Sequence, residues 1–200
     1  MWFSKTEGTE AVLTLLLFGL ALVGAYRIRP WYKRLMGDTT VPDLLSALKP
    51  EYRVFHGIDL AGRMDPVHID HLILSPYGIF VIKTMSYGGV IKGDDADKYW
   101  SDTVRVDTRV LENPVRINRR DADEMARLLG CRRDQIIPMV VFSNAAVLKG
   151  HYEHTVINLT HMLGTIRKYK EVRLSEEEIC RCLPILEKLN GRAEPGDPGK

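Results

Sequence analysis

Cysteine is scarce in this sequence, with three residues in a chain of 200: Cys131, Cys180 and Cys182. The one close pair reads Cys-Arg-Cys, which lacks the spacing of redox and zinc-binding motifs. An odd number of cysteines also argues against a disulfide framework. A disulfide-stapled secreted domain and a zinc finger are therefore excluded, and we expect three free thiols in a reducing compartment.

An excess of one charge is also missing. The chain has 28 Lys and Arg residues against 26 Asp and Glu residues, which leaves a net charge of +2. A balance so close to neutral does not by itself indicate a nucleic-acid-binding polycation. The apolar fraction of 45% is an ordinary globular value, so the chain can bury a core.

Long hydrophobic runs are absent except for one near the N-terminus. Ala11 to Tyr26 holds sixteen residues without a charge. As a helix this run is about 24 Å long, which nearly spans a hydrocarbon core of about 30 Å. We predict a retained transmembrane helix at residues 11–28. A cleaved signal peptide and a buried soluble helix are the alternatives, and Glu7 and Glu10 ahead of the run argue against the signal peptide.

Basic residues set the expected orientation of this helix. Lys5 alone precedes the apolar run, whereas four basic residues follow it: Arg27, Arg29, Lys33 and Arg34. The positive-inside tendency places the folded domain in the cytoplasm and the N-terminus outside. The predicted segments are a short N-terminal tail (1–10), the transmembrane helix (11–28), a basic juxtamembrane linker (29–45), one folded domain (46–190) and a disordered tail (191–200).

The order of strand-like and helix-like segments predicts an α/β or α+β sandwich around a mixed sheet. Two apolar strands flank a Ser-Pro-Tyr-Gly turn at 75–78, and the continuous apolar run 136–142 is typical of a strand covered on both faces. Asn113-Pro114 opens a helix that ends at Gly130, and Ser175 opens the last helix with a capping box. Shorter elements are expected as helices at 41–48 and 161–168 and as strands at 52–57, 90–91, 98–101 and 156–157.

Five separated blocks of sequence carry a resemblance to a known family. They read HIDHLILSPYGIFVI (68–82), GGVIKGDDADKYW (88–100), NPVRINRRDADEMARLLG (113–130), IIPMVVFSNAAVL (136–148) and VINL (156–159). Together they resemble the NERD (nuclease-related) domain of the PD-(D/E)xK superfamily over about residues 52 to 170. The resemblance implies a restriction-endonuclease-like sheet flanked by helices, and such domains are often attached to membrane spans.

The same resemblance implies a metal-dependent site, but few of its residues are present. Asp70 matches the family's metal-binding aspartate. The following strand should supply a Glu-x-Lys sequence, and Lys83 and Met85 occupy those two positions. Ile117 stands where the family's helix usually carries Gln, and only Asp43 is available for a glutamate expected ahead of the first strand. Asp70 and Lys83 are thus the candidate catalytic positions of a vestigial site.

Two hypotheses for function follow. In the first, the chain is a membrane-anchored NERD-like domain that is catalytically inactive, needs no cofactor, and acts as a binding or scaffold module with weak nucleic-acid affinity. In the second, it is a Mg²⁺-dependent DNA nuclease with a rearranged site, in which Asp70 and Lys83 act with Asp94, Asp95 or Asp97. His68 shares a strand face with Asp70 but lacks a third metal ligand in the sequence. The sequence identifies no protein partner.

The helix after Pro114 carries the candidate nucleic-acid residues Arg116, Arg119, Arg120 and Arg127. Arginines along one helix face can contact a phosphate backbone. The alternative is a solvated face that Asp121, Asp123 and Glu124 largely neutralise, which is the more frequent arrangement. Tyr87, Tyr99 and Trp100 could stack on bases, although aromatic residues of short strands more often belong to the core.

Overall fold

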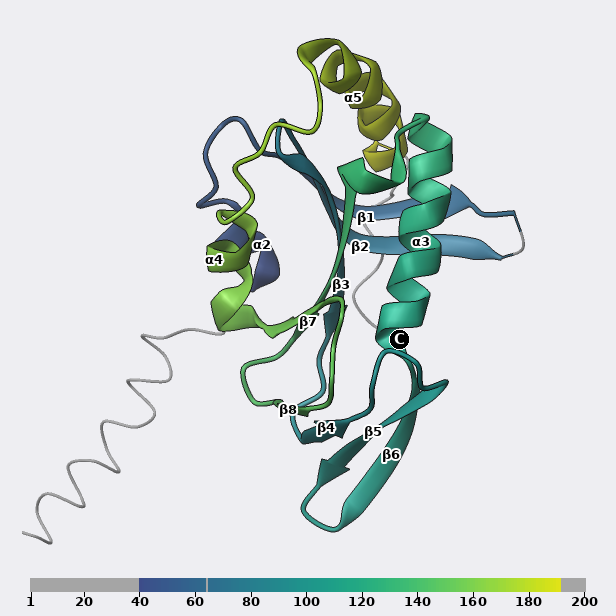
Figure 1. Cartoon of the computed structure of the whole chain (residues 1–200), viewed down its shortest axis with the longest axis vertical. Coiled ribbons are helices and arrows are strands. Elements are labelled where there is room, and N and C mark those ends of the chain that lie inside the picture. Colours follow the sequence, from purple (N-terminus) through teal and green to yellow (C-terminus); the bar gives the residue numbers. More distant parts are fainter. Residues whose placement is uncertain (1–39, 64, 192–200) are drawn as a thin grey trace, which may run out of the picture. The chain divides into compact units, whose positions relative to one another are not determined.

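A computed structural model describes residues 40–63 and 65–191, and these form two sheets with helices packed against the larger one (Figure 1). The five-stranded sheet has the order β1-β2-β3-β7-β9 and mixes antiparallel with parallel pairs. Its strands are β1 (Arg53–Ala61), β2 (Pro66–Ser75), β3 (Gly78–Met85), β7 (Ile136–Phe142) and β9 (Thr155–Asn158).

The second sheet has four short strands in the order β6-β5-β4-β8. They are β4 (Val90–Lys92), β5 (Tyr99–Val104), β6 (Asp107–Glu112) and β8 (Val147–Lys149). Its inner residues Ile91, Trp100 and Leu111 are buried in one cluster with Phe142 of the larger sheet. This shared core joins the two sheets, and the indole of Trp100 stacks on the ring of Phe142.

Two long helices, α3 (Pro114–Leu129) and α5 (Glu176–Asn190), cover one face of the larger sheet (Figure 1). Asn113 caps α3, because its Oδ1 accepts a hydrogen bond from the backbone N–H of Val115 at 2.9 Å. Gly130 ends this helix in the left-handed conformation, with φ 63°. The capping box expected at the start of α5 is formed between Ser175 and Glu178.

A short helix, α4 (Met162–Ile166), lies on the opposite face of the larger sheet (Figure 1). Both end residues of α4 are fully buried. The remaining helical segments are α2 (Val41–Leu45) and the 3-10 turns η1 (Arg133–Gln135) and η2 (Leu159–His161). Because strands β3 and β7 have helices on both sides, they read as continuous apolar runs rather than as alternating ones.

The inward-facing side of β1 and β2 changes partway along both strands. Phe55 is buried in the core under α5, but the next core residues of β1 are Ile58 and Leu60, so the alternation breaks at Gly57. Gly57 has φ 61°, a conformation that a side chain disfavours. In β2 the alternation breaks at the neighbouring positions Asp70 and His71. The site predicted from Asp70 therefore lies at a distortion of the sheet.

Asn118 of α3 compensates for a proline inside the sheet. Pro138 of β7 pairs in register with Val81 of β3 and has no backbone N–H to give to the ladder. The side-chain amide of Asn118 donates to the carbonyl of Val81 at 3.1 Å and to that of Met139 at 3.0 Å. A buried polar side chain thus fastens α3 directly to two central strands.

The mixed sheet flanked by helices, the hairpin at the Ser-Pro-Tyr-Gly turn, the helix after Asn113 and the strand 136–142 are confirmed. The division into two sheets, and strands β6 and β8, were not predicted. Two expected helices are shorter than predicted, at Val41–Leu45 and Met162–Ile166. No helix within residues 40–63 and 65–191 is long and apolar enough to cross a membrane. The predicted span at 11–28 and most of the predicted tail lie outside the described residues.

Candidate functional site

Asp70 lies where β2 and β3 separate. The paired register of these strands ends at His71 and Ile82, and beyond this point the carboxylate of Asp70 replaces the ladder. Its Oδ2 accepts hydrogen bonds from the backbone N–H of Thr84 at 2.6 Å and from Thr84 Oγ1 at 2.8 Å. The Asp70 side chain is 20% exposed. One of its two oxygens is therefore occupied by the protein itself.

Lys83 faces α3 and forms an ion pair with a carboxylate that the sequence did not single out as a site residue. Its Nζ lies 3.7 Å from Oδ2 of Asp121, whose side chain is 3% exposed. Arg120 approaches the other oxygen of Asp121 at 3.3 Å. Burial raises the pKa of the Asp121 carboxyl, and the charges of Lys83 and Arg120 oppose that rise. The ammonium of Lys83 is thus committed to Asp121.

The donor set around Asp70 does not fit a catalytic Mg²⁺ ion. Magnesium takes oxygen ligands, whereas the residue that should supply a carboxylate on β3 is the ammonium of Lys83. Met85 packs against the core shared by the two sheets, and Ile117 is half-buried in α3. Within the described ranges, no group of three or more His, Cys, Asp or Glu side chains is arranged to hold a metal ion.

His68 lies between two carboxylates on the exposed end of the β1–β2 ribbon. Its Nδ1 is 2.7 Å from Oδ1 of Asp59, and its Nε2 is 3.6 Å from Oδ1 of Asp70. The expected shared face of His68 and Asp70 is consistent with this contact. Asp59 was not predicted, but the register places it directly opposite His68. The side chains of His68 and Asp59 are more than half exposed, so this chain of contacts faces solvent.

The aspartates at 94, 95 and 97 form a loop between β4 and β5 that is held by hydrogen bonds. Oδ1 of Asp94 accepts from the backbone N–H of His151 at 2.6 Å. Oδ2 of Asp95 accepts from the backbone N–H groups of Glu153 and His154 and lies 2.5 Å from Nδ1 of His154. Oδ2 of Asp97 accepts from the backbone N–H of Asp94. These carboxylates connect the loop to residues 151–154.

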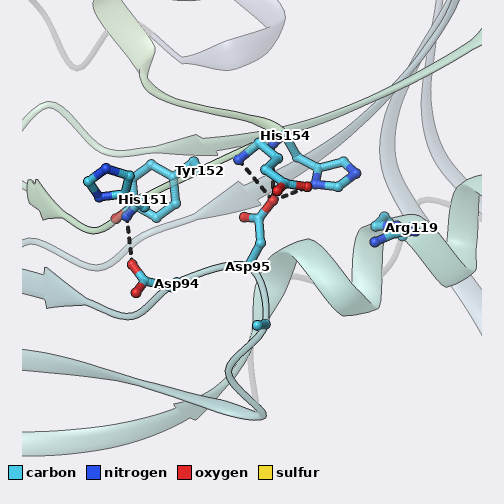
Figure 2. Close-up of a pocket in the computed structure, with 8 residues that line it drawn as sticks. Asp94, Asp95, Arg119, His151, Tyr152 and His154 are labelled. Carbon is cyan, nitrogen blue, oxygen red and sulfur yellow. Dashed lines mark hydrogen bonds and ion pairs between the residues drawn. The ribbon is translucent and has the colours of Figure 1, made fainter.

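A cavity of about 410 Å³ opens between this loop and α3 (Figure 2). The side chain of Arg119 reaches it from the helix, and residues 151–154 form the opposite wall. The same loop is also fastened from below, because the side-chain amide of Asn113 donates to three of its carbonyl groups, those of Asp94, Asp95 and Asp97. The cavity was not predicted, because its walls are far apart in sequence.

The four predicted nucleic-acid arginines are all exposed on α3, but they differ in their partners. Arg127 forms an ion pair with Glu124 at 2.6 Å, and Arg120 pairs with Asp121 and with Asp65. Arg116 and Arg119 form no ion pair within the described part of the chain. Of the three aromatic candidates, Trp100 is buried and Tyr87 is partly buried, whereas Tyr99 is 55% exposed.

The fold and this arrangement define a nuclease-related domain. The sequence profile of that family, NERD (nuclease-related domain), matches residues 33–143, more than half of the chain, and the protein belongs to this family. The match begins earlier and ends earlier than the resemblance noted from the sequence. An uncharacterized protein of Bacillus anthracis is 26% identical over 176 residues, which cover 85% of this chain and 82% of the relative. No solved structure matches.

Proposed function

We propose that this chain is a member of the NERD family that binds nucleic acid without hydrolysing it. The observation that carries the proposal is the ion pair between Lys83 and the buried Asp121. It puts a paired cation where a hydrolytic site requires a metal-binding carboxylate. Because removing one partner of a buried ion pair is costly, Lys83 is not free to swing away and make room for Mg²⁺.

The unpaired arginines support the binding part of the proposal. Arg116 and Arg119 are one helical turn apart on α3, so their side chains lie on the same side of the helix. Exposed arginines without an acidic partner are suited to phosphate oxygens. Paired arginines such as Arg127 gain less from a phosphate, because the contact with Glu124 must first be broken. The expected surface is therefore the N-terminal half of α3.

A single assay with end-labelled 20-nucleotide DNA tests both parts. We expect salt-dependent binding to the purified full-length chain and no shortening of the DNA with Mg²⁺ or Mn²⁺. Arg116→Glu should weaken binding by about 5-fold or more and reduce the salt dependence, because each lost phosphate contact lowers the slope by about 0.9. The matched control is Arg53→Glu, an exposed arginine of β1 with the same charge change.

Two outcomes would contradict this proposal. Metal-dependent cleavage that is lost in Asp70→Ala would favour the rearranged Mg²⁺ nuclease. Equal effects of Arg116→Glu and Arg53→Glu would remove α3 from the binding surface and leave only general electrostatic attraction.

We further propose that the apolar run at residues 11–28 anchors the domain at the cytoplasmic side of a membrane. The absence of charge from Ala11 to Tyr26 and the four basic residues that follow support this topology. A reporter that is active only in the cytoplasm, fused after Lys200, should be active and should sediment with membranes. Exchanging Leu15 and Leu16 for arginine should release it, and activity of an externally active reporter at the same point would refute the orientation.

A further inference from the structure

The cavity in Figure 2 has the size and the mixed lining of a small-ligand site. Its volume of about 410 Å³ falls within the usual range of about 300–1,000 Å³ for ligand pockets. The walls come from three parts of the chain that the fold holds firmly. These are the loop around Asp94 and Asp95, the segment 151–154, and Arg119 on α3.

Two cationic or hydrogen-bond-donating side chains reach the cavity with capacity to spare. Arg119 has no ion pair within the described residues, and its charge contributes, after burial, to lowering the pKa of the neighbouring Arg133 guanidinium. An anion between the two arginines would relieve this repulsion. His154 is held by Asp95 through Nδ1 at 2.5 Å, which leaves its Nε2 available to a ligand. Figure 2 shows the imidazole of His154 on the side of Asp95 that faces Arg119.

Two buried oxygen atoms of the lining have no hydrogen-bond partner among the described residues. They are Oδ1 of Asp95 and the hydroxyl of Tyr152. Buried polar atoms are rarely left unpaired. Burial, together with the charges of Asp94 and Asp95, raises the pKa of Tyr152, so its hydroxyl keeps its proton and can donate. A carboxylate oxygen such as Asp95 Oδ1 requires a donor, and a ligand hydroxyl is one.

We propose that this cavity binds a nucleotide. Arg119 and Nε2 of His154 bind the phosphate, and Oδ1 of Asp95 accepts a hydrogen bond from a sugar hydroxyl. The exposed carboxylates of Asp94 and Glu153 at the rim repel further negative charge, so a monophosphate is preferred to a triphosphate. The nucleotide is either free or the phosphorylated end of a strand. The site does not depend on the α3 surface proposed above, since it requires only one nucleotide.

Calorimetric titration of the purified full-length chain with AMP, adenosine and ATP tests the site. AMP should bind at least about 10-fold more tightly than adenosine or ATP, because charge-assisted hydrogen bonds to the phosphate are the strongest contacts. Arg119→Gln and His154→Gln should each weaken AMP binding by about 10-fold. Arg116→Gln is the matched control, because Arg116 lies one turn away and does not line the cavity. Circular dichroism checks that each variant is folded.

A second titration identifies the source of the nucleotide. A 5′-phosphorylated oligonucleotide that binds more tightly than its unphosphorylated form, with the difference lost in His154→Gln, assigns the site to a strand end. Binding of AMP without that difference assigns it to a free nucleotide. Failure to bind AMP at millimolar concentration, equal binding of adenosine, or equal losses in Arg119→Gln and Arg116→Gln would each overturn the proposal. Failure of unphosphorylated DNA to bind would count only against the α3 surface.

Discussion

Replacing Lys83 with methionine should lower the free energy of unfolding by about 3 kcal/mol, because breaking a buried ion pair leaves an uncompensated charge. Asp121, 3% exposed, would keep only Arg120, whose side chain is half exposed. The loss should shrink in acid, since Asp121 can then take up a proton and become neutral. Urea denaturation of the full-length chain at pH 8 and at pH 5 measures both effects.

Two further variants separate the ion pair from other roles of Lys83. Arg127→Met removes an exposed ion pair with Glu124 and should cost less than about 1 kcal/mol. The double variant Lys83→Met/Asp121→Leu should recover most of the lost stability, because a buried ion pair can be exchanged for apolar residues at little cost. If Lys83→Met is as stable as the parent, Lys83 does not neutralise Asp121, and the main support for an inactive site is lost.

Acid should destabilise the domain through the pair of histidines on β1 and β2. Nδ1 of His56 lies 2.8 Å from Nδ1 of His71. Burial, with a smaller contribution from His56, lowers the pKa of His71 from 6.5 to about 4. Asp70 raises this pKa and His68 lowers it further. The neutral pair is therefore the native form, and protonation of either ring opposes the contact.

The sign follows from proton binding. Between pH 6.5 and about 4 the unfolded chain holds more protons at His71 than the native state, so stability is full above pH 6.5 and falls as the pH approaches 4. The loss amounts to at most about 3 kcal/mol, since one pKa unit corresponds to about 1.4 kcal/mol. Denaturation midpoints across this range measure it. His71→Gln should flatten the pH dependence, whereas His161→Gln, on an exposed histidine, should not.

Sequence patterns predicted the elements whose signals are local. The turn at Ser75 to Gly78, the capped helix after Asn113 and the apolar strand at 136–142 each depend on neighbouring residues, and each is present. Strands β6 and β8 were missed because they are short and exposed, so apolar alternation is weak in both. The distortion at Gly57 and Asp70 was also missed, since a uniform period of two assumes an undistorted strand.

The candidate site was predicted only in part, because its decisive contacts are long-range. The sequence indicated that Lys83 replaces a carboxylate, but the partner Asp121 lies on a helix that had been read as solvated on that face. Asp59 reaches His68 only through the strand register. The cavity walls at 94–95 and 151–154 are brought together by side chains bonding to backbone N–H groups, a pattern with no local sequence signal.

The attachments of α3 determine how this helix meets a ligand. Asn113 holds its first turn to the loop at 94–97, Asn118 bonds two central strands, and Asp121 pairs with Lys83. A helix fastened at three successive levels has little freedom to slide or tilt over the sheet. Arg116 and Arg119, carried between these points, are held in place before any phosphate arrives. Association at this surface then costs little backbone ordering, so a small number of contacts can suffice for binding.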